Sequence, residues 1–467
     1  MIDLRIFKDR RIAVMGLGLS GLVAAEALCA GGADVLAWDD NDERRAEAVR
    51  RGVPVAPLVE ADWSSIDSLV LSPGIPHLHP APNPVARSAR DAGVEIIGDI
   101  ELLIRAQPSA RYVGVTGTNG KSTTTALIGH ILKTMGARVA VGGNLGLPAL
   151  SLEALGADGI YVLEMSSYQL ELTPSARFDV AILLNLSPDH LDRHGGMAGY
   201  IAAKRRIFEQ QPEGATAVIG VDDAESVGLY DGLMAAGRGA VIPISADRAV
   251  DGGVYACGPV LYDNTTGREH EVRSLAGIET LPGTHNAQNA AAAFAALQAL
   301  GIESSAIAAA LETYPGLPHR QQLAAVIDGV KYVNDSKATN PEAAAKALSS
   351  YDDILWIAGG RGKEGSLAPL YPYLPRVRRA YLIGEAAGKM ALELKGRVAT
   401  QACGNLENAL DAASRDASGT EAVVLLSPAC ASFDQFSSFE ERGRVFCRLA
   451  AALPGGRRDV RYAGEAA

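Results

Sequence analysis

The sequence contains few cysteines and no long apolar run, and each absence excludes a class of protein. Its 5 cysteines are widely spaced and form no CxxC pair, so neither a disulfide framework nor a zinc ribbon is expected, and a reducing cytoplasm fits. No uninterrupted apolar stretch approaches the length needed to cross a bilayer, and the charged N-terminus has no apolar signal segment. We therefore expect an unprocessed cytoplasmic protein without membrane insertion.

An excess of positive charge is also absent. The formal net charge of −11 argues against a nucleic-acid-binding surface, so basic side chains are expected to act one at a time. The 48% share of apolar residues allows a large buried core, and a length of 467 residues predicts about three domains. No coiled coil or repeat demands assembly, which favours a monomer.

The stretch GVTGTNGKST, residues 114–123, is a variant phosphate loop. A valine stands where the usual pattern GxxxxGK[ST] has its first glycine. Gly117 and Gly120 can still take positive φ, so backbone N–H groups can form an anion nest, while Lys121 adds positive charge and Ser122 a Mg²⁺ ligand. Because an apolar run precedes the loop and a helical pattern follows, the loop is expected between a strand and a helix N-terminus, which favours phosphate.

The first segment carries a second glycine motif. Gly16, Gly18 and Gly21 spell GxGxxG after a short apolar strand, and Asp39 ends the next expected strand. A segment of about 98 residues holds only one mononucleotide half of a doubly wound fold, so a single nucleotide or the nucleotide end of a larger substrate fits better than a dinucleotide. The alternative, that the glycines serve only helix–strand packing, stays open.

Polar residues follow the apolar strands of the second segment. Glu164, Asn185 and Asp222 stand at expected strand ends, and His190 follows Asn185. Because such ends line one crevice of an open α/β sheet, Glu164 is a candidate Mg²⁺ ligand; a surface carboxylate beside a turn is the alternative. His190 and His194 have the HxxxH spacing of zinc ligands, but no glutamate is adjacent, so a zinc protease is not expected.

Two helical stretches carry further candidates. An alanine-rich helix begins near Asn286 and Asn289, whose amides suit an adenine edge but equally suit helix capping. Lys204 lies in the helical stretch YIAAKRRIFEQ, where a charge normally faces water. An ammonium group cannot bind a metal unless a covalent change removes its charge and supplies oxygens.

The third segment follows a break at YPGLPHRQQ and again alternates strands with helices. A hairpin is expected in VIDGVKYVNDSKATN, further strands in DILWIAGG and RAYLIGEA, and a strand leading to a helix in AVVLLSPACASFDQF. These patterns predict an α/β protein with its functional groups at strand ends.

The motifs GTNGKST, LEMSSYQLE, NLSPDHLDRH, AAKRRIF, THNAQN, PHR, NDSKATN and LSPACASFDQF, in this order, resemble those of the Mur ligases along nearly the whole chain. The loop alone is shared with folylpolyglutamate synthases, whereas the last two motifs are more selective. The resemblance implies three domains. They are an N-terminal Rossmann-like UDP-substrate domain (1–98), a central phosphate-loop ATPase domain with a mainly parallel sheet (99–316) and a C-terminal Rossmann-like amino-acid-binding domain (317–467).

The resemblance also implies an activity. ATP would phosphorylate the carboxylate of UDP-N-acetylmuramoyl-L-alanine, and D-glutamate would open the acyl phosphate to form an amide, as a step of cytoplasmic peptidoglycan precursor synthesis. The alternatives are a sister Mur ligase or a folylpolyglutamate synthase-like ligase, a phosphate-loop binding ATPase and an NAD-dependent oxidoreductase.

The resemblance further assigns residues to each substrate. Contacts to ATP are implied for the loop and four later residues: Gly117, Thr118, Asn119, Gly120, Lys121, Ser122, Thr123, Asn286, Asn289, Arg320 and Asp335. Contacts to the UDP substrate are implied for Gly18, Leu19, Ser20, Asp39, Ser72, Pro73, Gly74 and Asn144. Contacts to the amino acid are implied for Lys337, Thr339, Lys363, Ser432 and Phe439.

Catalytic and metal roles are implied for a smaller set. The catalytic residues would be Lys121, Glu164, His190 and Lys204, and two Mg²⁺ sites would use Ser122, Glu164, His190 and a carbamylated Lys204. Carbamylation turns the amine into a monoanion with two oxygens, which suits a hard cation. The chain departs from the family pattern after Asp39, where Asp40 and Asn41 replace a basic residue.

Overall fold

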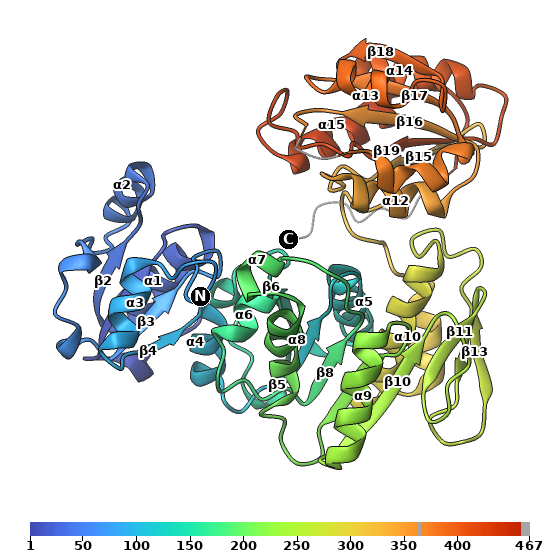
Figure 1. The fold of residues 1–467 in the computed structure, drawn as a ribbon. Coiled ribbons are helices and arrows are strands. Elements are labelled where there is room, and N and C mark those ends of the chain that lie inside the picture. Colours follow the sequence, from blue (N-terminus) through green and yellow to red (C-terminus); the bar gives the residue numbers. More distant parts are fainter. Residues whose placement is uncertain (363–365, 459–467) are drawn as a thin grey trace. The chain divides into compact units, whose positions relative to one another are not determined.

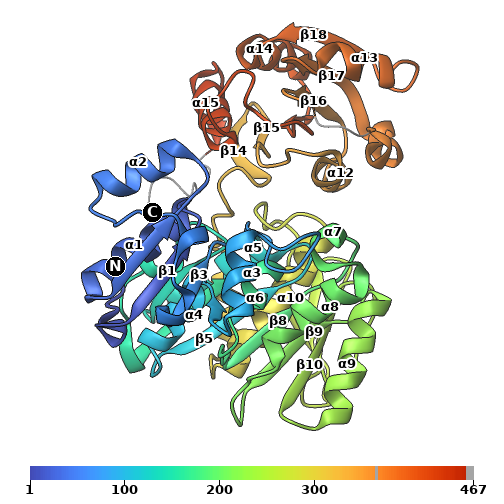
Figure 2. The same ribbon diagram turned by 60° about the vertical axis from the view of Figure 1, so that its left-hand side comes forward.

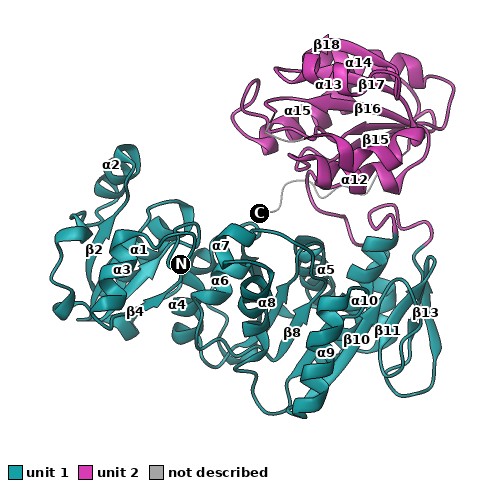
Figure 3. Ribbon diagram, viewed as in Figure 1, with its two compact units in different colours: residues 1–275, 284–312 teal, residues 276–283, 313–467 magenta. Residues whose placement is uncertain are grey.

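The computed structural model describes residues 1–362 and 366–458, so Lys363 lies outside the described residues. Two compact units divide the chain (Figure 3): unit 1 comprises Met1–Leu275 and Thr284–Glu312, and unit 2 comprises Ala276–Gly283 and Thr313–Ala467. Unit 1 contains two separate sheets and unit 2 contains one. The domain boundaries at residues 98 and 316 stay predictions.

The first sheet has four parallel strands in the order β2-β1-β3-β4. Its elements are β1 (Arg11–Met15), α1 (Leu19–Gly31), β2 (Asp34–Trp38), α2 (Asp42–Arg50), β3 (Ser68–Leu71), α3 (Pro84–Asp91) and β4 (Glu95–Ile97). The GxGxxG turn joins β1 to α1 as predicted. A Cβ on Gly21 would lie 1.8 Å from the carbonyl oxygen of Gly16, so this glycine lets helix and strand pack closely.

The second sheet has nine strands in the order β13-β12-β11-β10-β9-β8-β5-β7-β6, and all but the β11-β12-β13 edge is parallel (Figure 1). The strands are β5 (Arg111–Thr116), β6 (Arg138–Gly143), β7 (Gly159–Glu164), β8 (Val180–Leu183), β9 (Thr216–Gly220), β10 (Ala240–Ser245), β11 (Val254–Cys257), β12 (Val260–Asp263) and β13 (His270–Ser274).

Helices cover this second sheet (Figure 2). They are α4 (Asp99–Ala106), α5 (Lys121–Thr134), α6 (Ser167–Glu171), α7 (Leu191–His194), α8 (Met197–Arg205), α9 (Ala224–Ala236), α10 (Thr284–Ala299) and α11 (Ser304–Leu311). The alanine-rich α10 is buried from Asn286 to Leu297 and packs against α5 and strands β9 to β11. Small side chains allow this close approach, which explains the composition of the helix.

Unit 2 is a doubly wound sheet in the order β18-β17-β16-β19-β15-β14-β20. Its elements are β14 (Gln322–Ile327), β15 (Val330–Asn334), α12 (Pro341–Ser350), β16 (Ile354–Gly359), β17 (Val377–Ile383), α13 (Ala387–Glu393), β18 (Thr400–Gly404), α14 (Leu406–Ala417), β19 (Val423–Leu426), α15 (Phe439–Ala452) and β20 (Arg457–Arg458). The predicted β14–β15 hairpin is confirmed. Alternate residues of β16 enter different cores, since Trp356 packs on one face and Leu355 and Ile357 on the other.

The predicted fold class is confirmed: the chain is an α/β protein with a mainly parallel central sheet and Rossmann-like sheets before and after it. Within residues 1–362 and 366–458, no helix is both long and apolar enough to span a membrane.

The phosphate loop connects β5 directly to α5, as the sequence predicts. Gly117 has a φ of 146° and Gly120 a φ of 86°, both in the region that favours glycine. A Cβ on Gly120 would lie 2.2 Å from Oδ1 of Asn289, so the loop also depends on the missing side chain.

Replacing Gly120 with alanine should therefore destabilise the protein more than the same change at Gly136. Gly136 also has a positive φ of 74°, but its added Cβ would meet nothing within 4 Å. Backbone strain is common to both variants, whereas overpacking at Gly120 should cost a further ~1–3 kcal/mol. Thermal unfolding of the two variants checks this, and equal losses would contradict the close contact.

Candidate active site

Three neighbouring parallel strands deliver the central candidates to one edge of the second sheet. In the order β8-β5-β7, the phosphate loop follows β5, Glu164 ends β7, and Asn185 follows β8. Val115 pairs with Glu164 in the β5–β7 register. The loop thus has a carboxylate on one flank and an amide on the other, as expected for the carboxyl ends of parallel strands.

Asn185 fixes the shape of the loop. Its Oδ1 accepts a hydrogen bond from the backbone N–H of Asn119 at 2.9 Å, and its Nδ2 donates to Oε1 of Gln288 at 3.0 Å. Gln288 in turn donates to Oδ2 of Asp222 at 2.8 Å. The backbone N–H of Thr118 donates to the carbonyl oxygen of Asn185. These bonds fix the conformation of the loop, and no sequence pattern indicated the role of Gln288.

Lys121 and Ser122 open α5 at the end of the loop. The Lys121 ammonium donates to the carbonyl oxygens of Gly117 and Thr118 at 2.8 and 2.9 Å, so it lies folded over the loop. Ser122 is buried. A cation above a nest of N–H groups at a helix N-terminus is an arrangement that attracts phosphate oxygens.

Glu164 is a buried carboxylate with one unpaired oxygen. Its side chain is 2% exposed, and Oε1 accepts a hydrogen bond from Nδ2 of Asn144 at 2.7 Å. Oε2 is buried without a hydrogen-bond partner among the described residues. An unpaired buried carboxylate oxygen is costly unless a cation meets it, so Glu164 has the chemistry of a metal ligand.

Lys204 does not face water, and the expectation from charge patterning is wrong. Its residue exposure is 1%, and Nζ donates to the carbonyl oxygen of Gly117 at 2.9 Å and to Oγ1 of Thr116 at 3.2 Å. Burial, assisted by the charge of Lys121, holds the pKa of this amine well below its ordinary value. Tyr200 and Lys204 share the buried face of α8 at an i, i+4 spacing. This spacing is the sequence feature that could have indicated the burial of Lys204.

The two histidines of HxxxH have different environments. His190 has a φ of 50°, its side chain is 52% exposed, and Nε2 lies 3.5 Å from Oδ2 of Asp189. His194 is buried, with Nδ1 3.1 Å from Oε1 of Glu171 and Nε2 2.9 Å from Oγ of Ser167. Both nitrogens of His194 are therefore engaged, which agrees with the rejection of a zinc protease.

Over the described part of the chain, no group of three or more His, Cys, Asp or Glu side chains is arranged to hold a metal ion.

Asn286 and Asn289 lie behind the loop in α10. Asn289 is 2% exposed; its Oδ1 accepts from Oγ1 of Thr124 at 3.2 Å and its Nδ2 donates to Oδ1 of Asn286 at 3.0 Å. The structure thus gives both amides a role in supporting α5 and the loop. Their contact with adenine stays a prediction.

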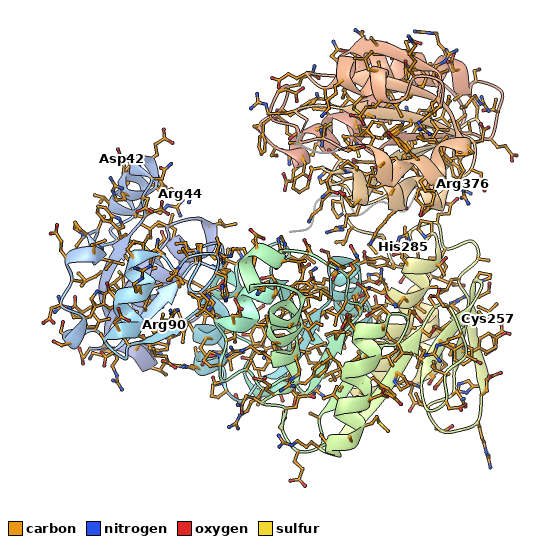
Figure 4. All side chains as sticks on the ribbon, in the orientation of Figure 1. Asp42, Arg44, Arg90, Cys257, His285 and Arg376 are labelled. Carbon is orange, nitrogen blue, oxygen red and sulfur yellow. The ribbon has the colours of Figure 1, made fainter. Side chains whose placement is uncertain are left out.

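Residues that follow β1, β2 and β3 of the first sheet meet around the GxGxxG loop. The carboxylate of Asp39, after β2, accepts from the backbone N–H of Leu17 at 2.7 Å, and Oγ of Ser72, after β3, donates to the carbonyl oxygen of Gly16 at 2.9 Å. Arg44 projects from α2 (Figure 4) and places Nη1 3.3 Å from Oδ2 of Asp39. Arg44 therefore supplies the basic group beside Asp39 that positions 40 and 41 lack. The sequence feature that could have indicated this role is the place of Arg44 in the helix that Asn41 caps.

Unit 2 gathers its candidates after β15, after β19 and at the start of α15. Asp335 accepts from Oγ of Ser427 at 2.7 Å, and burial raises the pKa of its carboxyl to about 7. Oγ of Ser432 is buried without a partner among the described residues. Nζ of Lys337 lies 5.5 Å from the ring centre of Phe439. The hydroxyl of Ser432 is therefore the polar atom of this group that a bound molecule can satisfy.

For Arg320 and Thr339, two further predicted site residues, the contacts described are mainly those of the backbone. Arg320 belongs to a short loop in which its backbone N–H donates to the carbonyl oxygen of Leu317, and its charge offsets a small part of the rise that burial causes in the pKa of Asp335. The backbone N–H of Thr339 donates to the carbonyl oxygen of Lys337. Sequence reasoning missed Arg442, a buried guanidinium whose Nε donates to Oγ of Ser336 at 2.9 Å.

Comparison with known proteins adds to this geometry. The Mur ligase middle domain matches residues 115–297, and the Mur ligase glutamate ligase domain matches residues 319–430. A curated UDP-N-acetylmuramoylalanine--D-glutamate ligase from Caulobacter vibrioides is 51% identical over 98% of both chains. The protein of the same name from Rhodospirillum rubrum is 51% identical over 98% of this chain and 99% of its own.

Solved structures show the same fold. The crystal structure of the UDP-N-acetylmuramate-alanine ligase from Thermotoga maritima matches with a TM-score of 0.57 and 20% identity. The match covers 94% of this chain and 98% of that one. At this identity the likeness concerns the fold alone.

Proposed function

The chain belongs to the Mur ligases, and from that premise we propose how its residues divide the work of one ligation reaction. It is an ATP-dependent ligase that adds D-glutamate to UDP-N-acetylmuramoyl-L-alanine in peptidoglycan synthesis. The full-length identity to ligases of that name is the observation that carries this function. This identity argues against the alternatives of an NAD-dependent oxidoreductase and a phosphate-loop binding ATPase.

ATP binding belongs to the phosphate loop. Residues 117–123 supply the N–H nest, and Lys121 supplies the charge that faces the outer phosphates. The hydrogen bonds from Asn185 support this assignment because they hold the nest open before ATP arrives. Asn286, Asn289, Arg320 and Asp335 remain proposed contacts for the rest of the nucleotide.

Glu164, Ser122 and Lys204 fit a Mg²⁺ ion that accompanies ATP. The fit rests on the unpaired buried oxygen of Glu164 and on the buried amine of Lys204. Burial lowers the pKa of this amine, which favours the neutral form that can attack CO₂ and lose a proton, and the carbamate formed carries two oxygens. His190 is the proposed further ligand. Mg²⁺ bound there would neutralise charge on the phosphates.

The two anionic substrates must approach one another in the first step. The carboxylate of the muramoyl-alanine attacks the γ-phosphorus of ATP, ADP leaves, and an acyl phosphate forms. Lys121 stabilises the charge that spreads over the transferred oxygens. In the second step the amine of D-glutamate attacks the acyl carbon, loses a proton and expels phosphate.

The remaining candidates hold the two other substrates. Gly18, Leu19, Ser20, Asp39 and Ser72–Gly74 are proposed for the UDP end, with Asn144 for the muramoyl part. Lys337, Thr339, Ser432 and Phe439 are proposed for D-glutamate, supported by the unpaired buried Ser432 hydroxyl. Mg²⁺, the monomeric state and a cytoplasmic location are likewise part of the proposal.

Phosphate release should require every substrate of this reaction. With ATP, UDP-N-acetylmuramoyl-L-alanine and D-glutamate present, phosphate and amide product should appear in equal amounts. Omitting the UDP substrate or D-glutamate should reduce release to the background rate, because the acyl phosphate is then either not made or not turned over. Rapid phosphate release with ATP alone would contradict the assignment.

Lys204 should carry a carbamate. In ¹³C-bicarbonate, the wild-type protein should show a carbamate carbon signal by NMR, and Lys204→Gln should lose both the signal and at least about a hundredfold in turnover. Lys133→Gln, at an exposed lysine of α5, is the matched control and should keep both. A wild-type protein without the signal, or a fully active Lys204→Gln, would rule the carbamate out.

A further inference from the structure

Arg193 of α7 reaches from the second sheet to a turn of the first. Its Nη2 lies 3.3 Å from the carbonyl oxygen of Pro73 and its Nη1 3.4 Å from that of Gly74. Its guanidinium carbon lies 4.7 Å from the ring centre of Tyr168. The Nε atom is buried and has no hydrogen-bond partner among the described residues. A charged side chain is thus held between a ring and two carbonyls of another element.

The turn that Arg193 contacts is attached to the GxGxxG loop. Ser72, the residue before Pro73, donates through Oγ to the carbonyl oxygen of Gly16 at 2.9 Å. In a trans peptide the carbonyl and the following N–H point in opposite directions. Fixing the Pro73 carbonyl toward Arg193 therefore points the N–H of Gly74 away from it. Arg193 thus sets which backbone donors the turn presents on its other side.

The Tyr168 ring that Arg193 contacts also packs against His190 and His194. The ring of Tyr168, over which Arg193 lies, has its centre 5.1 Å from that of His190 and 5.3 Å from that of His194. Arg193 and His190 thus share one packed neighbour, the ring of Tyr168.

A second contact joins α6 to the loop after β3. Glu171 of α6 accepts from His194 through Oε1, and its Oε2 lies 4.0 Å from Nδ1 of His77, a residue of the loop after β3. On the first-sheet side, Arg90 of α3 donates to the carbonyl oxygen of His77, and Figure 4 shows Arg90 on this part of the chain. The loop after β3 is therefore held by Arg90 from α3 and by Glu171 from α6. Arg193 contacts the Pro73–Gly74 turn of the same loop from α7.

We propose that Arg193 is a positioning residue that couples the Ser72–Gly74 turn to α7, so that binding of the nucleotide end of the UDP substrate fixes the placement of His190. The inference rests on the proposed function, because it takes the turn as part of the UDP site. Arg193 touches neither ATP nor the amino acid in this account. Its loss should therefore affect one substrate selectively.

Steady-state kinetics of Arg193→Ala tests this coupling. The KM for UDP-N-acetylmuramoyl-L-alanine should rise by about tenfold or more, because two charge-assisted hydrogen bonds to the turn are lost. The KM for D-glutamate, ATP binding measured by calorimetry and the thermal midpoint should stay close to wild type. Arg193→Lys should recover part of the loss, since lysine keeps the charge but not the planar fork that spans two carbonyls.

Two further variants separate positioning from general damage. Tyr168→Leu removes the ring that carries Arg193 and should raise the same KM, whereas Tyr168→Phe keeps the ring and should not. Arg87→Ala, at an exposed arginine of α3, is the matched charge control and should behave as wild type.

The proposal is overturned if Arg193→Ala leaves the KM for the UDP substrate within twofold of wild type. It is equally overturned if ATP binding weakens and the thermal midpoint falls while that KM rises, because Arg193 then serves the fold in general. A wild-type protein that fails to ligate would instead refute the proposed function, so the two failures are distinguishable.

Discussion

A lysine amine buried against a phosphate loop is the interaction on which the rest of this site depends. Lys204 donates to the carbonyl of Gly117 and to Thr116, and its exposure of 1% makes the ammonium form costly. Burial holds the pKa of this amine well below its ordinary value, which favours the neutral, nucleophilic form over the ammonium. In our proposal that nucleophile becomes a carbamate and balances the cations that serve ATP.

The parallel order of strands β8, β5 and β7 explains how the residues of the candidate site come together. Adjacent strands β8, β5 and β7 end at the same edge, so Asn185, the loop and Glu164 meet without long connections. Hydrogen bonds then make the edge rigid: Asn185 holds Asn119, and Gln288 holds Asn185 from α10. A loop ordered in this way loses little entropy when it binds phosphate, which is the advantage of preorganisation.

Local patterns predicted much of this arrangement. The strand–loop–helix at the phosphate loop, the hairpin of β14 and β15, and Glu164 at a strand end follow from apolar runs bounded by glycine and polar residues. Such features depend on neighbours in sequence. The resemblance to Mur ligases then supplied roles that periodicity could not give.

Other features depend on contacts between distant residues, and no local pattern specifies them. The burial of Lys204 arises because α8 packs on the loop, 88 residues from Thr116 in sequence. Arg193 contacts a turn 120 residues earlier. Arg44 supplies the basic group near Asp39 from a helix rather than from the next position. At Lys204 tertiary packing overrides the usual expectation that a charged side chain faces water.

The central claim is that a carboxylate oxygen of one substrate becomes bonded to the γ-phosphorus of ATP. The most direct measurement uses UDP-N-acetylmuramoyl-L-alanine labelled with ¹⁸O in its carboxylate, followed by mass analysis of the phosphate released during ligation. The account predicts that each phosphate carries one ¹⁸O atom from the acid. Unlabelled phosphate formed alongside the amide product would contradict it.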